Sequence, residues 1–213
     1  MNKYAVISSN TNLEYAPFLP LTSLLWKSVG YKTICLLTAG FIKRDDKGIL
    51  RYILNCLSRE PDVVIHTIGE ISGFKSSTIA QVSRLVAASV PVEDDAYLLT
   101  ADVDMLPLSP SWFNQQDFGS KFHVFCADVY GSPAEKHYQM CYLGGARNVW
   151  KSLMGIEEDC LDVELSRLLR GQPDGWFIDE AILAEKMKVW PTWGECQLLS
   201  RGYPPGGYAP NRL

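Results

Sequence analysis

The sequence predicts an α/β fold with a mostly parallel central sheet and helices on its faces. The first observation behind this prediction is an alternation of apolar strand-like runs and helix-like stretches, joined by short connections, through residues 1–108. The second is the apolar run that begins at Tyr97 and ends in two carboxylates, Asp102 and Asp104. Because ligands of open α/β sheets bind outside the carboxyl ends of the strands, we expect the functional site beside this pair.

The elements of the first half follow from the spacing of their apolar residues. Pro20 and Gly30 are typical of the two ends of a helix, and apolar residues three and four positions apart indicate two further helices. Short continuous apolar runs indicate buried parallel strands. In chain order we expect a strand at 4–8, a helix at 21–29, a strand at 32–38, a helix over 49–57, a strand at 63–68, a helix after Ser76 and a strand from Tyr97.

The second half is less regular, but it also alternates apolar runs with helix-like stretches. Glycines at 155 and 171 are expected to end two of its helices, and Asp174 is a plausible cap for the last. The expected elements are strands at 121–127 and 139–143 and helices at 149–154, at 157–170 and from Gly175 onward.

Two short motifs of the second half have both a structural and a functional interpretation. Gly144 and Gly145 follow the strand at 139–143, where they either form a plain turn or let the backbone approach a ligand closely. Asp179 and Glu180 fall in the first turn of the last helix, where they either stabilise the helix dipole or take part in chemistry.

Composition excludes several classes of protein. The 213 residues fit one large domain or two small ones, and a net charge of −4 without any basic run argues against nucleic-acid binding. No apolar stretch approaches the roughly 20 residues that span a bilayer, and the N-terminus lacks a signal-peptide pattern. The six cysteines form no Cys-x-x-Cys pair, and Cys35 and Cys126 lie in apolar runs, so we expect reduced core thiols in a cytoplasmic protein.

The two aspartates after the Tyr97 run are the main candidates for a metal site. Alternate residues of an extended segment point to one side, so Asp102 and Asp104 can face the same point, where two hard oxygen ligands suit Mg²⁺ or Mn²⁺ with a phosphate-bearing substrate. The alternative is that they only solvate the end of a strand. The chain has no Gly-x-Gly-x-x-Gly motif and no phosphate loop, so a bound nucleotide would need such a metal as its counter-charge.

Several motifs in this order resemble those of the nucleotide-sugar glycosyltransferases with the GT-A fold, from about Lys3 to Val189. The closer resemblance is to the compact glycosyltransferases of large algal (chlorella) viruses. The motifs are the polar loop Ser8-Ser9-Asn10-Thr11 with Tyr15, the helix residue Arg84, the Asp-x-Asp motif Asp102-Val103-Asp104, the segment Tyr142-Leu143-Gly144-Gly145 and the segment Trp176-Phe177-Ile178-Asp179-Glu180.

The resemblance implies a single GT-A domain that binds a UDP-sugar. Residues 1–108 would form its nucleotide-binding half, 109–195 its acceptor and sugar side, and 196–213 a C-terminal loop that covers a site or leads to a further domain. Asp104 would bind Mn²⁺ or Mg²⁺ directly, and Asp102 would contact the ribose or reach the metal through water. The remaining donor contacts would be Ser8, Asn10 and Tyr15 for the base and ribose, Lys75 and Arg84 for the ribose or the sugar, and Gly144 and Gly145 near the sugar.

The implied reaction moves a hexose or deoxyhexose from the UDP-sugar to a hydroxyl of a carbohydrate or glycoprotein glycan. Asp179 would act as general base in an inverting displacement, with Glu180 as the fallback base. If the enzyme instead retains configuration, Asp179 would position the sugar. One departure from the family is that no histidine follows His137 to complete a metal site.

Two other classes stay open at this stage. A nucleotidyltransferase also combines an α/β sheet with metal-binding aspartates, but it needs a Gly-rich, basic loop after the first strand, and residues 8–12 contain no Gly, Lys or Arg. A non-catalytic sugar-binding domain of a larger protein is the second alternative. Release of diphosphate from a sugar nucleotide would separate these classes from a glycosyltransferase.

Overall fold

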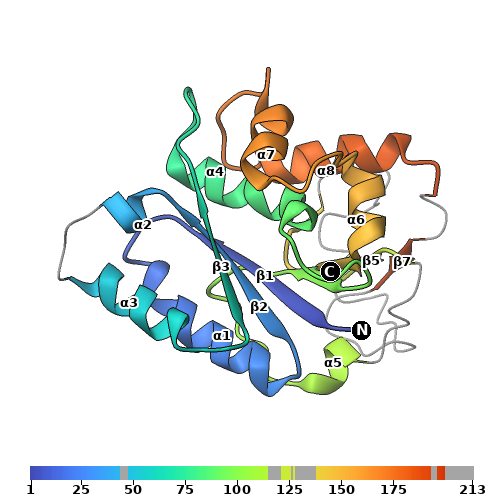
Figure 1. Cartoon of the computed structure of the whole chain (residues 1–213). Coiled ribbons are helices and arrows are strands. Elements are labelled where there is room, and N and C mark those ends of the chain that lie inside the picture. Colours follow the sequence, from blue (N-terminus) through green and yellow to red (C-terminus); the bar gives the residue numbers. More distant parts are fainter. Residues whose placement is uncertain (44–47, 115–120, 126, 128–137, 193–195, 200–213) are drawn as a thin grey trace, which may run out of the picture.

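A seven-stranded sheet forms the centre of the structure, a computed structural model in which residues 1–43, 48–114, 121–125, 127, 138–192 and 196–199 are described (Figure 1). The strand order is β3-β2-β1-β4-β6-β5-β7. The first four strands in this order are parallel, and β6 runs antiparallel between β4 and β5. The predicted mostly parallel α/β sheet is therefore confirmed.

The strands of the parallel half lie where the apolar runs predict them. Their side chains are almost all buried in β1, β2 and β4, as expected for strands covered on both faces. The strands of the whole sheet are β1 (Lys3–Ser9), β2 (Lys32–Thr38), β3 (Val63–Ile68), β4 (Tyr97–Thr100), β5 (His123–Val124), β6 (Leu143–Ala146) and β7 (Gln197–Leu198).

Helices cover both faces of the sheet and bury two separate apolar cores. On one face, α1 (Leu19–Ser28) and α3 (Ile49–Ser58) pack on β2 and β3, and Trp26 is fully buried there. On the other face, the second core lies between the sheet and a second group of helices (Figure 1). These are α4 (Ser76–Ser83), the 3-10 helix η2 (Arg84–Ser89), α6 (Arg147–Met154), α7 (Leu161–Leu169) and α8 (Ile178–Val189).

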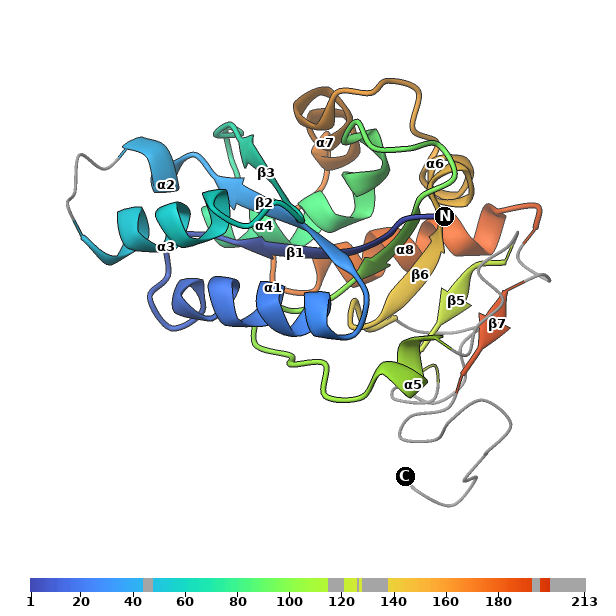
Figure 2. The ribbon, with the colours of Figure 1, turned by 60° about the horizontal axis from the view of Figure 1, so that its bottom comes forward.

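Three short helices complete the described chain. The 3-10 helix η1 (Ala16–Phe18) leads into α1, α2 (Gly40–Lys43) follows β2, and α5 (Pro110–Asn114) follows the segment with the two aspartates. Figure 2 shows β6, β5 and β7 at the opposite end of the sheet from β3. Because β1 and β4 are central and parallel, the loops that follow them meet at one edge of the sheet.

The strand expected at 139–143 is displaced toward the C-terminus. The observed β6 contains both glycines that were expected to follow a strand, and they pair with Leu98 and Leu99 of β4. A Cβ atom on Gly144 would lie 2.0 Å from Tyr97 Oη, and one on Gly145 would lie 3.0 Å from a Phe122 ring carbon. Large neighbouring rings therefore require glycine inside this strand. The strand expected at 121–127 is also shorter, since β5 has two residues.

The last two helices begin later than the sequence suggests. Helix α7 begins at Leu161 rather than at residue 157, because the Glu164 carboxylate accepts hydrogen bonds from the backbone N–H groups of Glu157 and Glu158 at 2.8 Å. Helix α8 begins at Ile178 and has no side-chain cap. The expected cap, Asp174, instead accepts hydrogen bonds at the N-terminus of α4, from Thr78 Oγ1 at 2.5 Å and from the Lys75 backbone N–H at 3.4 Å.

The cysteine prediction concerns the core. Cys35 is fully buried, and burial raises the pKa of its thiol to about 12, as expected for a reduced core residue; Cys126 lies outside the described residues. His123 is buried against Tyr97, whose hydroxyl lies 3.0 Å from Nδ1 of that ring. Among the described residues, no helix combines the length and the apolar character needed to cross a bilayer. The C-terminal tail from residue 200 lies outside the described residues.

Candidate active site

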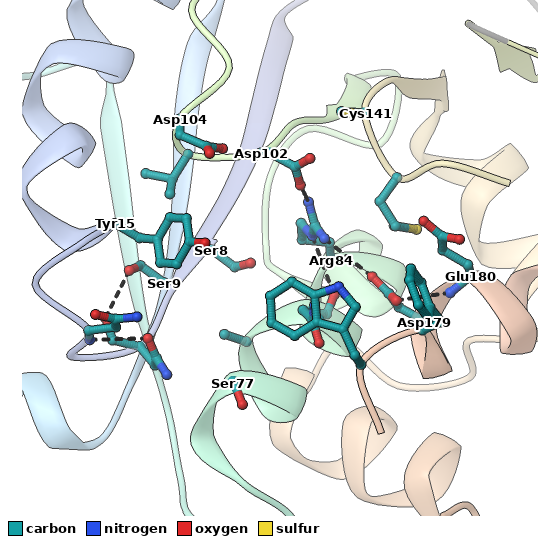
Figure 3. Close-up of a pocket in the computed structure, with 18 of the residues that line it drawn as sticks. Ser8, Ser9, Tyr15, Ser77, Arg84, Asp102, Asp104, Cys141, Asp179 and Glu180 are labelled. Carbon is teal, nitrogen blue, oxygen red and sulfur yellow. Dashed lines mark hydrogen bonds and ion pairs between the residues drawn. The ribbon is translucent and has the colours of Figure 1, made fainter. Parts of the chain in front are cut away.

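The candidate site is a cavity of about 270 Å³ at the carboxyl edge of β1 and β4 (Figure 3). The two strands pair in parallel, with Val6 beside Thr100, and the Ala101 backbone N–H donates to the Val6 carbonyl at 3.0 Å. The chain segments that leave both strands therefore enter the same cavity. This is the position where open α/β sheets bind their ligands.

The cavity brings together most of the residues predicted for the site. They come from the end of β1, the loop after it, the junction of α4 with η2, the loop after β4 and the first turn of α8. The predicted residues that line it are Ser8, Asn10, Tyr15, Arg84, Asp102, Asp104, Asp179 and Glu180.

Three predicted residues do not line the cavity. Lys75 points to solvent, with 80% of its side chain exposed, and lies 3.7 Å from Asp174. Gly144 and Gly145 lie inside β6 among Tyr97 and Phe122. Packing accounts for both glycines, and the structure does not bring them to the site.

A buried arginine joins the two sides of the cavity. The Arg84 guanidinium donates to the carboxylate of Asp102 and, at 3.2 Å, to Asp179 Oδ2. It also donates to the Ala101 carbonyl at 3.2 Å and to the Gln81 carbonyl at 3.4 Å. Burial alone lowers the pKa of Arg84, but the two carboxylates outweigh burial and raise it. The guanidinium therefore stays positively charged, and it donates its hydrogen bonds to acceptors of the protein.

The pKa values of the two carboxyl groups that contact Arg84 are shifted in opposite directions. Asp179 is buried, with 4% of its side chain exposed, and burial raises its pKa although Arg84 opposes the shift. Asp102 keeps 38% of its side chain exposed. Burial also raises the pKa of Asp102, but the adjacent Arg84 charge outweighs it, so that pKa is lowered. The cavity thus holds one stable carboxylate and one carboxyl group that protonates more readily than usual.

Asp104 is the carboxylate that is available to a ligand. It is exposed and lines the cavity, and no hydrogen bond or ion pair joins its side chain to any described residue. Asp102, in contrast, is held by Arg84. In Figure 3 Asp104 and Asp102 lie on one loop, with Ser8 and Tyr15 to one side of Arg84 and Asp179 with Glu180 to the other.

The donor set fits a hydrated divalent cation rather than a closed protein cage. Within the described ranges, no three His, Cys, Asp or Glu side chains gather as a metal site. Mg²⁺ commonly uses one or two carboxylates and completes its octahedron with water and substrate phosphates. Asp104 matches that pattern, because it lines the cavity and its side chain has no hydrogen-bond or ion-pair partner in the described part of the chain; Asp102 lies beside it on the same loop (Figure 3).

The polar wall after β1 is fixed by its own hydrogen bonds. The Ser9 hydroxyl donates to the Asn10 carbonyl at 2.8 Å, and Asn10 Oδ1 accepts from the Asn12 backbone N–H at 3.1 Å. Asn10 Nδ2 also reaches Ser76 Oγ at 3.3 Å, which connects this loop to the start of α4. These hydrogen bonds hold the loop after β1 in place against the start of α4.

The structure adds cavity residues that the sequence did not single out. Ser77 and Gln81 line the cavity with Arg84, at positions i, i+4 and i+7 of one helical stretch. Polar residues at this helical spacing, next to the apolar residues of the same stretch, were the sequence signal that could have revealed Ser77 and Gln81. Cys141 also lines the cavity, but it precedes β6 with no pattern to mark it.

Comparison with known proteins identifies the fold. No protein-family model and no curated protein matches the sequence. Among solved structures, a variant of Drosophila β1,4-galactosyltransferase 7 in complex with manganese, UDP-Gal and xylobiose is similar, with a TM-score of 0.51 and 12% identity over 96% of this chain and 67% of that chain.

A second group of similar structures leads to the same fold. The galactosyltransferase LgtC, in complex with donor and acceptor sugar analogues, gives a TM-score of 0.54 with 12% identity over 92% of this chain and 72% of that chain. An active-site variant of LgtC gives a TM-score of 0.55 with 14% identity over the same shares. The predicted GT-A arrangement is therefore confirmed as the fold of this chain.

Proposed function

We propose that the chain is a metal-dependent glycosyltransferase that moves a hexose or deoxyhexose from a UDP-sugar to a hydroxyl group of a glycan. The observation that carries the proposal is that one cavity presents two carboxyl groups of different character. Asp104 is exposed and has no hydrogen-bond or ion-pair partner among the described residues, and Asp179 is buried and has a raised pKa. The first suits a metal that carries phosphates, and the second suits a base. The galactosyltransferases of similar fold, one of them in a complex with manganese and UDP-Gal, support the choice of donor.

The donor would lie along the β1 side of the cavity. Ser8, Asn10 and Tyr15 offer hydroxyl, amide and aromatic groups to a base and ribose. Asp104 would hold Mn²⁺ or Mg²⁺ directly, and Asp102 would contact the ribose or a water on the metal. When bound, the cation supplies Lewis-acid stabilisation of the departing diphosphate.

Asp179 would take the proton from the acceptor hydroxyl in an inverting displacement. Its raised pKa brings a carboxylate closer to the range in which a general base works well. Glu180 is the fallback base, since it also lines the cavity and is only 9% exposed. Arg84, with its N–H groups on protein acceptors, would orient Asp179 relative to Asp102 rather than bind the sugar.

The experiment is a measurement of UDP release from a panel of UDP-sugars: UDP-glucose, UDP-galactose, UDP-N-acetylglucosamine and UDP-rhamnose. With Mn²⁺ we expect release from at least one donor, and with EDTA none. UTP together with a sugar 1-phosphate, the substrate pair of a nucleotidyltransferase, serves as the control and should yield no pyrophosphate. Absence of UDP release from every donor, together with no effect of Mn²⁺ and UDP on the thermal unfolding midpoint, would overturn the proposal.

A further inference from the structure

A threonine of α1 contacts the segment that carries the two aspartates. Thr22 Oγ1 donates a hydrogen bond to the backbone carbonyl of Val103 at 2.5 Å, and the two residues are 81 positions apart in the sequence. Thr22 is fully buried and Val103 is only 6% exposed, so solvent does not reach this contact. The segment that leads from β4 to α5 runs beside α1 (Figure 2), and this hydrogen bond joins the two.

The Thr22 hydroxyl bonds outside its own helix, unlike other helical hydroxyls of this chain. A Ser or Thr hydroxyl in a helix commonly bonds to a backbone carbonyl three or four residues earlier in the same helix. Ser28, Ser83 and Ser89 do so, each with the carbonyl three residues earlier, at 2.6–2.7 Å. Thr22 donates to Val103 instead, and because a buried carbonyl without a partner is costly, this contact fixes the position of the Val103 carbonyl.

Val103 is one of the two central residues of a tight turn. The Met105 backbone N–H donates to the Asp102 carbonyl at 3.2 Å, which closes a four-residue turn with Val103 and Asp104 at its centre. The peptide between the two central residues of such a turn has two orientations, which distinguish turn types I and II. Since the Val103 carbonyl belongs to that peptide, the hydrogen bond from Thr22 selects one of the two orientations.

The orientation of this peptide sets the direction of the Asp104 side chain. Arg84 holds the Asp102 carboxylate, whereas no hydrogen bond or ion pair from the described residues holds the carboxylate of Asp104. A change of turn type changes φ of the second central residue, which is Asp104, and so redirects its side chain. The backbone contact of Val103 with Thr22 is therefore what directs Asp104 within the cavity.

We propose that Thr22 is a positioning residue for the metal site, and that its hydroxyl, by fixing the peptide between Val103 and Asp104, directs the Asp104 carboxylate to the cation. The inference rests on the proposed function. Residues that orient a metal ligand without touching the metal commonly change metal affinity by about 10–100-fold when they are replaced. Thr22 itself does not line the cavity, so an effect of its hydroxyl on the metal acts through Val103.

The test measures UDP affinity by isothermal titration calorimetry, with Mn²⁺ and with EDTA. Thr22→Val keeps the shape of the side chain but removes its hydroxyl. We expect the gain in UDP affinity that Mn²⁺ provides to fall by about tenfold, or to be lost, in Thr22→Val, while UDP affinity in EDTA stays that of wild type. Thr22→Ser keeps a hydroxyl at this position and should keep a Mn²⁺ gain close to that of wild type.

Ser23→Ala is the matched control. Ser23 is the next residue of α1 and is 3% exposed, but its hydroxyl lies 3.8 Å from the Cys35 sulfur rather than at the turn. Removing it should leave the Mn²⁺ gain unchanged. The thermal unfolding midpoint without ligand establishes that each variant is folded. If Thr22→Val does not fold, Thr22→Ala removes the same hydroxyl without adding a methyl group and gives the same comparison.

The outcomes separate this inference from the proposed function. If Mn²⁺ does not raise the UDP affinity of wild type, the proposed function fails and this inference fails with it. If wild type shows the gain and a folded variant without the Thr22 hydroxyl shows the same gain, only the role of Thr22 is refuted. An equal loss in Thr22→Ser or Ser23→Ala would also refute it, because the effect would then come from the packing of α1. An equal loss of UDP affinity in EDTA would do the same, since an effect through Asp104 requires the metal.

Discussion

Replacing Arg84 by methionine should destabilise the protein strongly at neutral pH. Methionine fills similar apolar volume but leaves Asp102 and Asp179 without their shared cation. Asp102 keeps 38% of its side chain exposed and can be solvated, whereas Asp179 keeps 4%. Breaking a buried pair in this way costs about 3–5 kcal/mol. Because one of the two carboxylates reaches solvent, we expect the free energy of unfolding to fall by about 3 kcal/mol, the lower end of this range.

The loss in Arg84→Met should shrink as the pH falls from 8 to 5. Burial raises the pKa of Asp179, so its protonated form is favoured more in the folded chain than in the unfolded one, and the stability that this shift contributes is present at low pH and lost as pH rises. Removing Arg84 removes the charge that opposes this shift. Asp102 has a lowered pKa, so its stabilising contribution in wild type is fully present above the ordinary aspartate pKa of about 3.9 and does not change between pH 8 and 5. Protonation of Asp179, which is easier once Arg84 is absent, therefore brings the variant closer to wild type at pH 5.

Urea unfolding at the two pH values, followed by circular dichroism, measures this difference. The double variant Arg84→Met with Asp179→Asn is the control, because the amide carries no charge and should recover about half of the loss. A loss under about 1 kcal/mol at pH 8, or a loss of the same size in the double variant, would refute the reasoning that the buried charge of Asp179 dominates.

Three further predictions concern the base and the packing of β6. Asp179→Asn should keep UDP binding but lower transfer by about a hundredfold or more, while Glu180→Gln keeps most activity; the reverse order in steady-state kinetics would assign the base to Glu180. The acid limb of the wild-type pH–rate profile should lie above the ordinary aspartate pKa of about 3.9, and a limb at or below that value would contradict the burial of Asp179. Gly144→Ala should cost about 1–3 kcal/mol by forcing a Cβ into Tyr97, and Gly175→Ala should be nearly neutral; equal unfolding midpoints would show that packing does not require Gly144.

The parallel half of the fold was predictable because its signals are local and agree with one another. The run Lys32–Thr38 has a continuous apolar centre, Ile34–Leu37, and it forms a strand with the predicted bounds because both of its faces are covered. The antiparallel half was harder. The glycines of β6 weaken any strand signal, and their place in the strand is decided by Tyr97 and Phe122, which are distant in sequence.

The candidate site likewise has a part that could be predicted from the sequence and a part that could not. Asp102 and Asp104 follow a clear strand, so their place at the sheet edge could be inferred from pattern alone. The role of Arg84 could not, since an arginine in line with the polar residues of a helical stretch does not reveal that it lies buried between Asp102 and Asp179. Asp174 was placed at the wrong helix for a related reason, because a capping preference does not specify which helix the side chain reaches.

The central claim is that Asp104 couples a divalent cation to a sugar nucleotide in this cavity. The most direct measurement is isothermal titration calorimetry of UDP into wild type and Asp104→Ala, each with Mn²⁺ and with EDTA. We predict that Mn²⁺ raises the UDP affinity of wild type at least tenfold and has no effect on the affinity of Asp104→Ala. The same UDP affinity in Mn²⁺ and EDTA for wild type, or the same Mn²⁺ effect in both proteins, would contradict the account.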